Sequence, residues 1–207
     1  MPPPEYHPML KKLAKKNGIL YIADEVQAGM GRTGKMFAIE HWSVEPDIIC
    51  LAKGIASGLP LGAMIARSKL MVWGKGAHAS TLGGNPLSCR ASLKTIELLQ
   101  KKYINNAAKV GAYMINRLKA MQEKSQVIGD VRGKGLMIAA EIVKNKKTKT
   151  KVPEIRETII QKCFKKGLLL LGCGDTAVRF SPSLIVTKQA ADKALEIFER
   201  SLKTIKK

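Results

Sequence analysis

An aspartate and a lysine each follow an apolar run of the sequence, and together they could support chemistry on a bound ligand. Asp24 ends the run 18–23 (GILYIA), and Lys53 follows the run 48–52 (IICLA). Apolar runs rich in β-branched residues that stop at a charge are typical of buried parallel strands. Because ligands of open α/β sheets lie beyond the carboxyl ends of the strands, we expect both side chains to face one crevice.

Two interpretations of this lysine and acid follow from their chemistry. The pair can be a structural ion pair at the edge of the sheet. Alternatively, partial burial favours the neutral Lys53 amine, which can attack an aldehyde cofactor. Asp24 would then keep a pyridine nitrogen of that cofactor protonated, which is the combination that pyridoxal phosphate requires.

The composition is that of a globular protein with a strong positive charge. The 207 residues are 45% hydrophobic, and 36 Lys and Arg against 16 Asp and Glu give a net charge of +20. This charge raises nucleic-acid binding as a distant alternative. The lysines are spread along helix-like segments, the run 144–151 is typical of a solvated loop, and aromatic residues are only 5%. Nucleic-acid binding is therefore not favoured, because basic and aromatic residues do not alternate.

The cysteines and the first residues bear on the compartment. Cys50, Cys89, Cys163 and Cys173 are widely separated and form no CxxC pair. They are interpreted as reduced core residues, not as a metal site or a disulfide framework, which predicts a cytoplasmic protein. Residues 1–12 lack the apolar run of a signal peptide, and no stretch is long enough to cross a membrane.

A literal GxGxxG match at residues 29–34 could suggest a dinucleotide site. That fingerprint places its glycines directly at the turn from strand to helix, whereas residues 24–28 intervene here. No long helical pattern follows, and Asp47 precedes the next strand instead of ending it. We interpret these glycines as an exposed flexible loop.

Hydrophobic periodicity predicts an α/β fold with two domains. Helices are expected at 5–17, 87–99, 107–121, 153–166 and 188–203, and strands at 18–23, 48–52, 63–66, 136–143, 167–171 and 177–180. Long helices give way to short strands near residue 125, which places the boundary between a first domain, 1–122, and a second, 123–207.

The run 22–63, which contains Asp24 and Lys53, resembles the cofactor-binding segment of class III pyridoxal-phosphate-dependent aminotransferases. This group includes 4-aminobutyrate and ornithine aminotransferases. The similarity continues through 81–86 and more weakly at 180–184, so it covers nearly the whole chain. It implies the fold type I of pyridoxal-phosphate-dependent transferases, with 1–122 as part of the large domain and its connecting helices, and 123–207 as the small C-terminal α/β domain.

The resemblance also implies roles for individual residues. Lys53 matches the lysine that forms a Schiff base (aldimine) with the cofactor and then acts as the general acid and base. Asp24 matches the carboxylate that pairs with the pyridinium nitrogen. Val26 matches the side chain packed on the ring, and Gln27 matches the amide near the phenolic oxygen; the alternative for each is ordinary packing at a strand end.

Two further positions of the resemblance concern phosphate and substrate. Thr81 matches a threonine that reaches the cofactor phosphate of the neighbouring subunit, which implies a homodimer; the alternative is a turn hydroxyl that caps a helix. Arg179 matches an arginine on the substrate side. The resemblance implies no metal.

Family members are about twice as long as this chain, which resembles their C-terminal half. The loop that holds the phosphate, the aromatic residue stacked on the ring and much of the substrate pocket belong to the first half. The expected function is transfer of an amino group from an ω-amino acid such as 4-aminobutyrate to 2-oxoglutarate or a similar oxo acid. The alternatives are a non-catalytic fragment and one subunit of a split enzyme that pairs with a separate N-terminal half.

Overall fold

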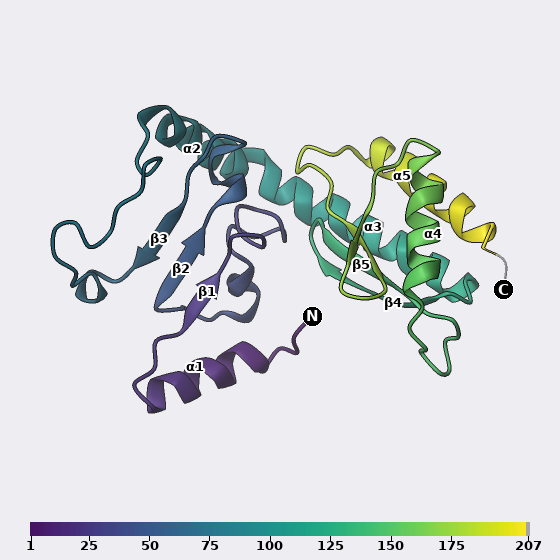
Figure 1. Ribbon diagram of the computed structural model, residues 1–207, viewed down its shortest axis with the longest axis horizontal. Coiled ribbons are helices and arrows are strands. Elements are labelled where there is room, and N and C mark those ends of the chain that lie inside the picture. The colour runs from purple at the N-terminus through teal and green to yellow at the C-terminus, as the bar shows by residue number, and fades with distance from the viewer. Residues whose placement is uncertain (206–207) are drawn as a thin grey trace. The chain divides into compact units, whose positions relative to one another are not determined.

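The computed structural model describes residues 1–205, and the chain divides into two compact units, Met1–Asn105 and Asn106–Lys207. Each unit combines helices with a small sheet, which confirms the expected α/β class (Figure 1). Within residues 1–205, no helix is both long enough and apolar enough to span a bilayer.

The first unit is built on a three-stranded sheet. Its elements are α1 (Tyr6–Lys16), β1 (Ile22–Asp24), β2 (Ile48–Leu51), β3 (Ala63–Ala66) and α2 (Pro86–Leu98). The strand order is β1-β2-β3, with β1 parallel to β2 and β3 antiparallel to β2. Ile22 lies beside Ile48 and Asp24 beside Cys50, so the two strands that precede the predicted site residues end at the same edge, as expected.

The prediction that the run 18–23 is a buried strand is wrong. Only its last two residues join β1, and Ile19, Leu20 and Ile22 are 61%, 48% and 54% exposed. The reason is that β1 is the edge strand, so among the described residues no strand covers its outer side.

Helix α1 is attached to the rest of the first unit by aromatic and polar contacts. The His7 ring lies 4.5 Å from the Trp42 ring, measured between centroids, and His7 Nδ1 is 2.6 Å from the Tyr21 hydroxyl. Lys11 Nζ donates to Asp47 Oδ2 at 2.6 Å, and the same oxygen accepts the Tyr21 N–H at 2.8 Å. These contacts join α1 to the residue before β1 and to the segment between β1 and β2.

The stability of the first unit is expected to fall on mild acidification because of His7. Burial lowers the pKa of His7 from its usual 6.5, so the folded state favours the neutral imidazole. The stabilisation is therefore complete above pH 6.5 and is lost as the pH falls through the lowered pKa. Denaturant unfolding at pH 7.5 and 5.5 would measure this, with His7→Phe as the matched variant. An equal pH dependence in both proteins would contradict it.

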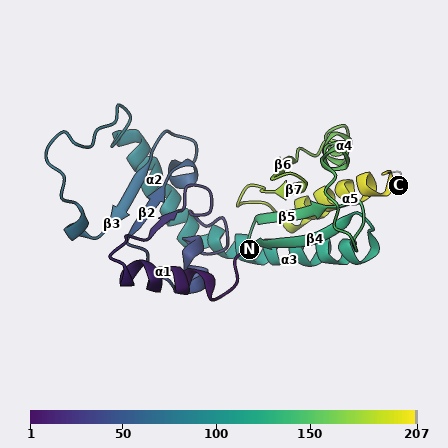
Figure 2. The same ribbon diagram turned by 60° about the horizontal axis from the view of Figure 1, so that its bottom comes forward.

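The second unit is an antiparallel sheet covered by helices (Figure 2). Its elements are α3 (Ile104–Lys124), β4 (Ile128–Lys134), β5 (Met137–Ile142), α4 (Pro153–Phe164), β6 (Leu171–Cys173), β7 (Ala177–Phe180) and α5 (Lys188–Lys203), and the strand order is β4-β5-β7-β6. Alternate residues of β5, Ile138, Ala140 and Ile142, are buried in one core with α3, α4 and α5. The Phe180 and Phe198 rings meet edge to face in this core.

The two units are divided within the first turn of α3, earlier than the boundary expected between residues 122 and 123. Helix α3 follows α2 without a loop, through a π-helical segment, Leu99–Tyr103. Val110, Met114 and Leu118 of α3 are buried in the core of the second unit. For this reason α3 packs as part of the second unit. The assignment of residues 1–122 and 123–207 to a large and a small domain stays a prediction.

All four cysteines are free, but the prediction that they are core residues holds for Cys163 only. Cys50, Cys89 and Cys173 are partly exposed.

Candidate active site

Asp24 and Lys53 lie at the carboxyl ends of two neighbouring parallel strands, as the sequence predicted. Asp24 is the last residue of β1 and is exposed. Its Oδ1 atom accepts the Val26 N–H at 3.0 Å and starts the turn that follows the strand. Lys53 follows β2 after one residue. Because β1 and β2 are in register, both side chains leave the sheet at one edge.

Lys53 is held in an unusual backbone conformation. It begins the 3₁₀ turn η2 (Lys53–Ala56) with φ +47°, a region that non-glycine residues adopt at a cost of about 1 kcal/mol. The turn is held in place by the residues after Lys53: Ile55 and Ala56 are buried, and the Ser57 hydroxyl lies 2.9 Å from the Thr95 hydroxyl of α2. The tertiary structure therefore imposes the direction in which Lys53 leaves the strand.

The amine of Lys53 donates a hydrogen bond to Gln27 Oε1 at 2.6 Å. This contact joins two predicted site residues from different loops. The prediction that Lys53 is partly buried is wrong for this chain, because both Lys53 and Gln27 are exposed. Within the first unit, no residue covers the side chains of Lys53 and Gln27.

The segment after β1 is a compact, buried loop, so its interpretation as an exposed flexible loop is wrong. Gly29, Met30 and Gly31 are buried, and Thr33 is 5% exposed. A Cβ at Gly29 would lie 2.8 Å from a backbone oxygen of Glu25, so only glycine fits there. Gly29 thus serves close packing, whereas Gly31 and Gly34 adopt φ +83° and +84°, a region that favours glycine. Both reasons agree with rejecting a dinucleotide fingerprint.

Sequence reasoning missed Glu25, the central residue of this loop. Glu25 is 3% exposed, and its two carboxylate oxygens accept the N–H groups of Ala38 at 3.0 Å and Ile39 at 2.8 Å. A signal was available: two acids in succession at the end of a strand point to opposite sides, so one of them must face inward.

Thr81 and Arg179 belong to other segments of the chain than this edge of the first sheet. Thr81 lies in an exposed turn before α2, and Asn85, not Thr81, caps that helix by accepting the Ser88 N–H at 3.1 Å. Arg179 is a half-buried residue of β7 in the second unit, paired with Ala139 on β5. The structure therefore assembles Asp24, Val26, Gln27 and Lys53 at one edge of the first sheet.

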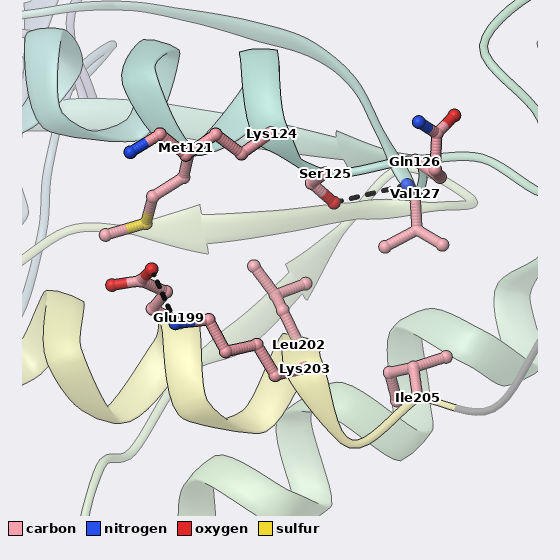
Figure 3. Close-up of a pocket in the computed structure, with 9 residues that line it drawn as sticks. All are labelled: Met121, Lys124, Ser125, Gln126, Val127, Glu199, Leu202, Lys203 and Ile205. Carbon is pink, nitrogen blue, oxygen red and sulfur yellow. Dashed lines mark hydrogen bonds and ion pairs between the residues drawn. The ribbon is translucent and has the colours of Figure 1, made fainter.

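A pocket in the second unit contains none of the predicted residues (Figure 3). It lies between the ends of α3 and α5, where Met121 and Leu202 contribute apolar surface. Its charged groups are already engaged in part, since Lys203 pairs with Glu199 at 3.0 Å. Within residues 1–205, no cluster of three or more His, Cys, Asp or Glu side chains could hold a metal ion.

Comparison with known proteins identifies relatives along the whole chain. A leucine/methionine racemase of Thermococcus litoralis is 40% identical over 98% of this chain and 46% of its own length. An acetylornithine aminotransferase of Caldanaerobacter subterraneus is 40% identical over 98% of this chain and 50% of its own. A 4-aminobutyrate aminotransferase of Mycobacterium leprae is 40% identical over 91% and 43%. The chain thus spans about half the length of the curated relatives it matches.

Solved structures agree with this assignment. An amine transaminase from an uncultivated Pseudomonas species, solved in a PLP-bound form, superposes with a TM-score of 0.91 at 35% identity. The match covers 98% of this chain and 48% of that one. The sequence pattern of the family described as "Aminotransferase class-III" matches residues 1–202. The chain therefore belongs to the class-III aminotransferase family, and its fold is that of the pyridoxal-phosphate-dependent transaminases.

Proposed function

We propose that this chain carries the lysine-bearing part of a pyridoxal-phosphate-dependent transaminase. The observation that carries the proposal is the placement of Asp24 and Lys53 at the ends of adjacent parallel strands, with Lys53 Nζ bonded to Gln27. Family membership supports the same activity. A structural ion pair is not supported, because Lys53 bonds to a neutral amide instead of a carboxylate.

The residues at this edge fit pyridoxal phosphate. Lys53 offers an exposed amine, and the Asp24 carboxylate uses only Oδ1 in a hydrogen bond within the described chain, so Oδ2 can accept another. When bound, pyridoxal phosphate supplies an aldehyde that condenses with amines and a pyridinium ring that withdraws electrons from the substrate carbon.

Each side chain would have a distinct task in that chemistry. Lys53 would anchor the cofactor through Nζ, then take a proton from the substrate carbon and return it at the next step. Gln27 would orient Lys53 Nζ through the hydrogen bond that it already makes. Asp24 would hold a proton on the ring nitrogen by its negative charge, and Val26 would pack against the ring.

The remaining predicted partners are also proposals. Thr81 would bind the phosphate of a cofactor in a second subunit of a homodimer, and Arg179 would bind a carboxylate of the substrate. The exposure of Thr81 and the half-buried position of Arg179 on β7 are compatible with these roles. A cytoplasmic location is supported by the four free cysteines.

For the reaction, we propose amino transfer from an ω-amino acid such as 4-aminobutyrate to 2-oxoglutarate or a similar oxo acid. Similarity to a 4-aminobutyrate aminotransferase supports this donor. The chain is equally identical to an acetylornithine aminotransferase and to an amino-acid racemase, so transfer from acetylornithine and racemisation are the competing reactions. The residues at the Lys53 edge would not select among them, because in this proposal they contact the cofactor and not the substrate side chain.

The test is a donor panel with the full chain and pyridoxal phosphate. 4-Aminobutyrate, acetylornithine, L-leucine and L-alanine are supplied with 2-oxoglutarate, and glutamate and the D-amino acids are measured. Glutamate formed fastest from 4-aminobutyrate is expected. D-amino acids without glutamate would contradict transamination and indicate a racemase.

A second candidate, a subunit that needs a separate N-terminal half, is favoured by the exposed outer edge of β1. Ile19, Leu20 and Ile22 there are apolar and roughly half exposed or more. A polypeptide that adds a strand beside β1 would bury them. No product from any donor with the chain alone, followed by activity once such a polypeptide is added, would support this candidate. No product in either case would support a non-catalytic fragment.

A further inference from the structure

Glu25 is a buried carboxylate that the chemistry described above does not use. It follows Asp24 directly, but its side chain is 3% exposed while that of Asp24 faces solvent. Both of its oxygens accept backbone N–H groups, from Ala38 and Ile39, at 3.0 and 2.8 Å. A buried charge is tolerated only when such hydrogen bonds replace its lost hydration.

The two N–H groups belong to the first residues of the 3₁₀ turn η1 (Ala38–Trp42). Residue Phe37, which precedes η1, has no side-chain oxygen that could accept them. Glu25 therefore performs the capping role from thirteen residues earlier in the chain. In doing so it closes residues 25–39 into a loop whose two ends are joined.

The same residue anchors the turn that presents Gln27. The Glu25 N–H donates to Cys50 O at 2.9 Å, which extends the pairing of β1 with β2, and its carbonyl accepts the Gly29 N–H at 2.9 Å. Gln27 lies inside this turn and accepts the hydrogen bond from Lys53. The main chain and the side chain of Glu25 thus hold both ends of the segment that carries Gln27.

The loop also reaches the residue after Lys53. Met30 is 6% exposed and adopts φ +54°, and its Cβ would lie 3.5 Å from a Cβ added at Gly54. The buried loop therefore packs against the start of η2, where Lys53 leaves the strand.

We propose that Glu25 is a positioning residue: its buried carboxylate locks the 25–39 loop, and the locked loop holds Gln27 against Lys53 Nζ. This role deepens the proposed function. It rests on that function only for the expected effect on pyridoxal phosphate attachment. The link from Glu25 to Lys53 is a property of the chain itself, so it can be measured in the cofactor-free protein.

The main variant is Glu25→Gln, which keeps the size of the side chain. An amide can accept one of the two N–H groups, but its own NH₂ then faces the other donor, so one buried N–H loses its partner. Glu40→Gln is the matched control. Glu40 is an exposed residue of the same turn η1, and its Oε1 accepts the Phe37 N–H at 2.7 Å.

A milder variant, Ala38→Pro, keeps the proposal testable if Glu25→Gln unfolds the chain. Proline at the first position of η1 removes the N–H that Glu25 Oε2 accepts. The preceding residue, Phe37, already has φ −121° and ψ 140°, which suits a residue before proline. Proline at position 38 is therefore expected to leave the turn in place while it deletes one of the two bonds.

The first measurement is amide hydrogen exchange together with competitive acetylation of lysines in the cofactor-free chain. In Glu25→Gln one of the two amides, Ala38 or Ile39, loses its acceptor and is expected to exchange about 10-fold faster, as loss of a hydrogen bond worth about 1.4 kcal/mol predicts. Acetylation of Lys53, relative to Lys193 in α5, is expected to rise because Gln27 no longer holds its amine. Ala38→Pro should change the acetylation in the same direction by less, and Glu40→Gln should not change it.

The second measurement is attachment of pyridoxal phosphate to Lys53, trapped with borohydride. It is expected to fall about 10-fold in Glu25→Gln relative to the wild type while overall folding, followed by circular dichroism, is kept. Faster exchange with unchanged Lys53 acetylation in both variants would overturn the positioning role. Absence of attachment in the wild type would instead contradict the proposed function, and the acetylation result would still decide the role of Glu25.

Discussion

Replacement of Lys53 by alanine is expected to abolish covalent attachment of pyridoxal phosphate to its site and to lower transamination about 10³-fold or more, because both the anchoring amine and the general base are removed. Lys53 Nζ is the amine that the structure places beside Gln27, at the edge where Asp24 also lies. The measurement is reduction with borohydride, peptide mapping by mass spectrometry and a single-turnover assay with an amino donor.

Lys35→Ala is the matched control for this experiment. Lys35 is also an exposed lysine of the first unit, but its Nζ donates to a backbone oxygen of Glu40 at 3.1 Å, away from Gln27. Its replacement should leave labelling of Lys53 unchanged. Asp24→Asn should keep the attachment but slow turnover about 100-fold, because the amide does not hold the ring proton. Equal transamination by Lys53→Ala and the wild type would contradict the assignment.

Replacement of Gly111 by alanine is expected to destabilise the second unit by about 3 kcal/mol, because the new methyl group overpacks a rigid contact. Gly111 is a buried residue of α3, and a Cβ there would lie 2.0 Å from the carbonyl oxygen of Gly135 and 2.2 Å from its carbonyl carbon. Both atoms belong to the backbone of the turn between β4 and β5, where Gly135 has φ +52°. The clash therefore cannot be relieved by rotating a side chain.

Helix propensity alone would predict the opposite, namely that Gly111→Ala raises the free energy of unfolding. At an unhindered position inside a helix, alanine is about 1 kcal/mol more favourable than glycine. Ala112→Gly, at the adjacent exposed position of α3, measures this term in the same helix and should destabilise by about 1 kcal/mol. The free energy of unfolding from denaturant titration checks both variants. An increase in stability on Gly111→Ala would show that α3 does not pass so close to the turn.

The sequence by itself was enough to predict the edge that carries Asp24 and Lys53. The information is local: an apolar run that stops at a charge specifies a strand and its end, and two such runs joined by a long connection favour parallel pairing. The strand at 63–66 and the helix at 188–203 were predicted with their observed bounds for the same reason, since period and end signals lie within each segment. The resemblance to the family favoured the cofactor interpretation of Lys53 and Asp24 over a structural ion pair, a choice that the chemistry of the two residues left open.

Only the tertiary structure decided what surrounds that edge. Glu25 is buried because two N–H groups thirteen and fourteen residues later meet its carboxylate, and no local pattern encodes such a meeting. Ile22 is exposed, although it is apolar, because the position of a strand within its sheet depends on which neighbours are present. Gly111 has no room for a side chain, because the backbone of the turn at Gly135 packs against it. Segment patterns determine which elements form, whereas burial, close packing and the direction of Lys53 depend on contacts between residues distant in the chain.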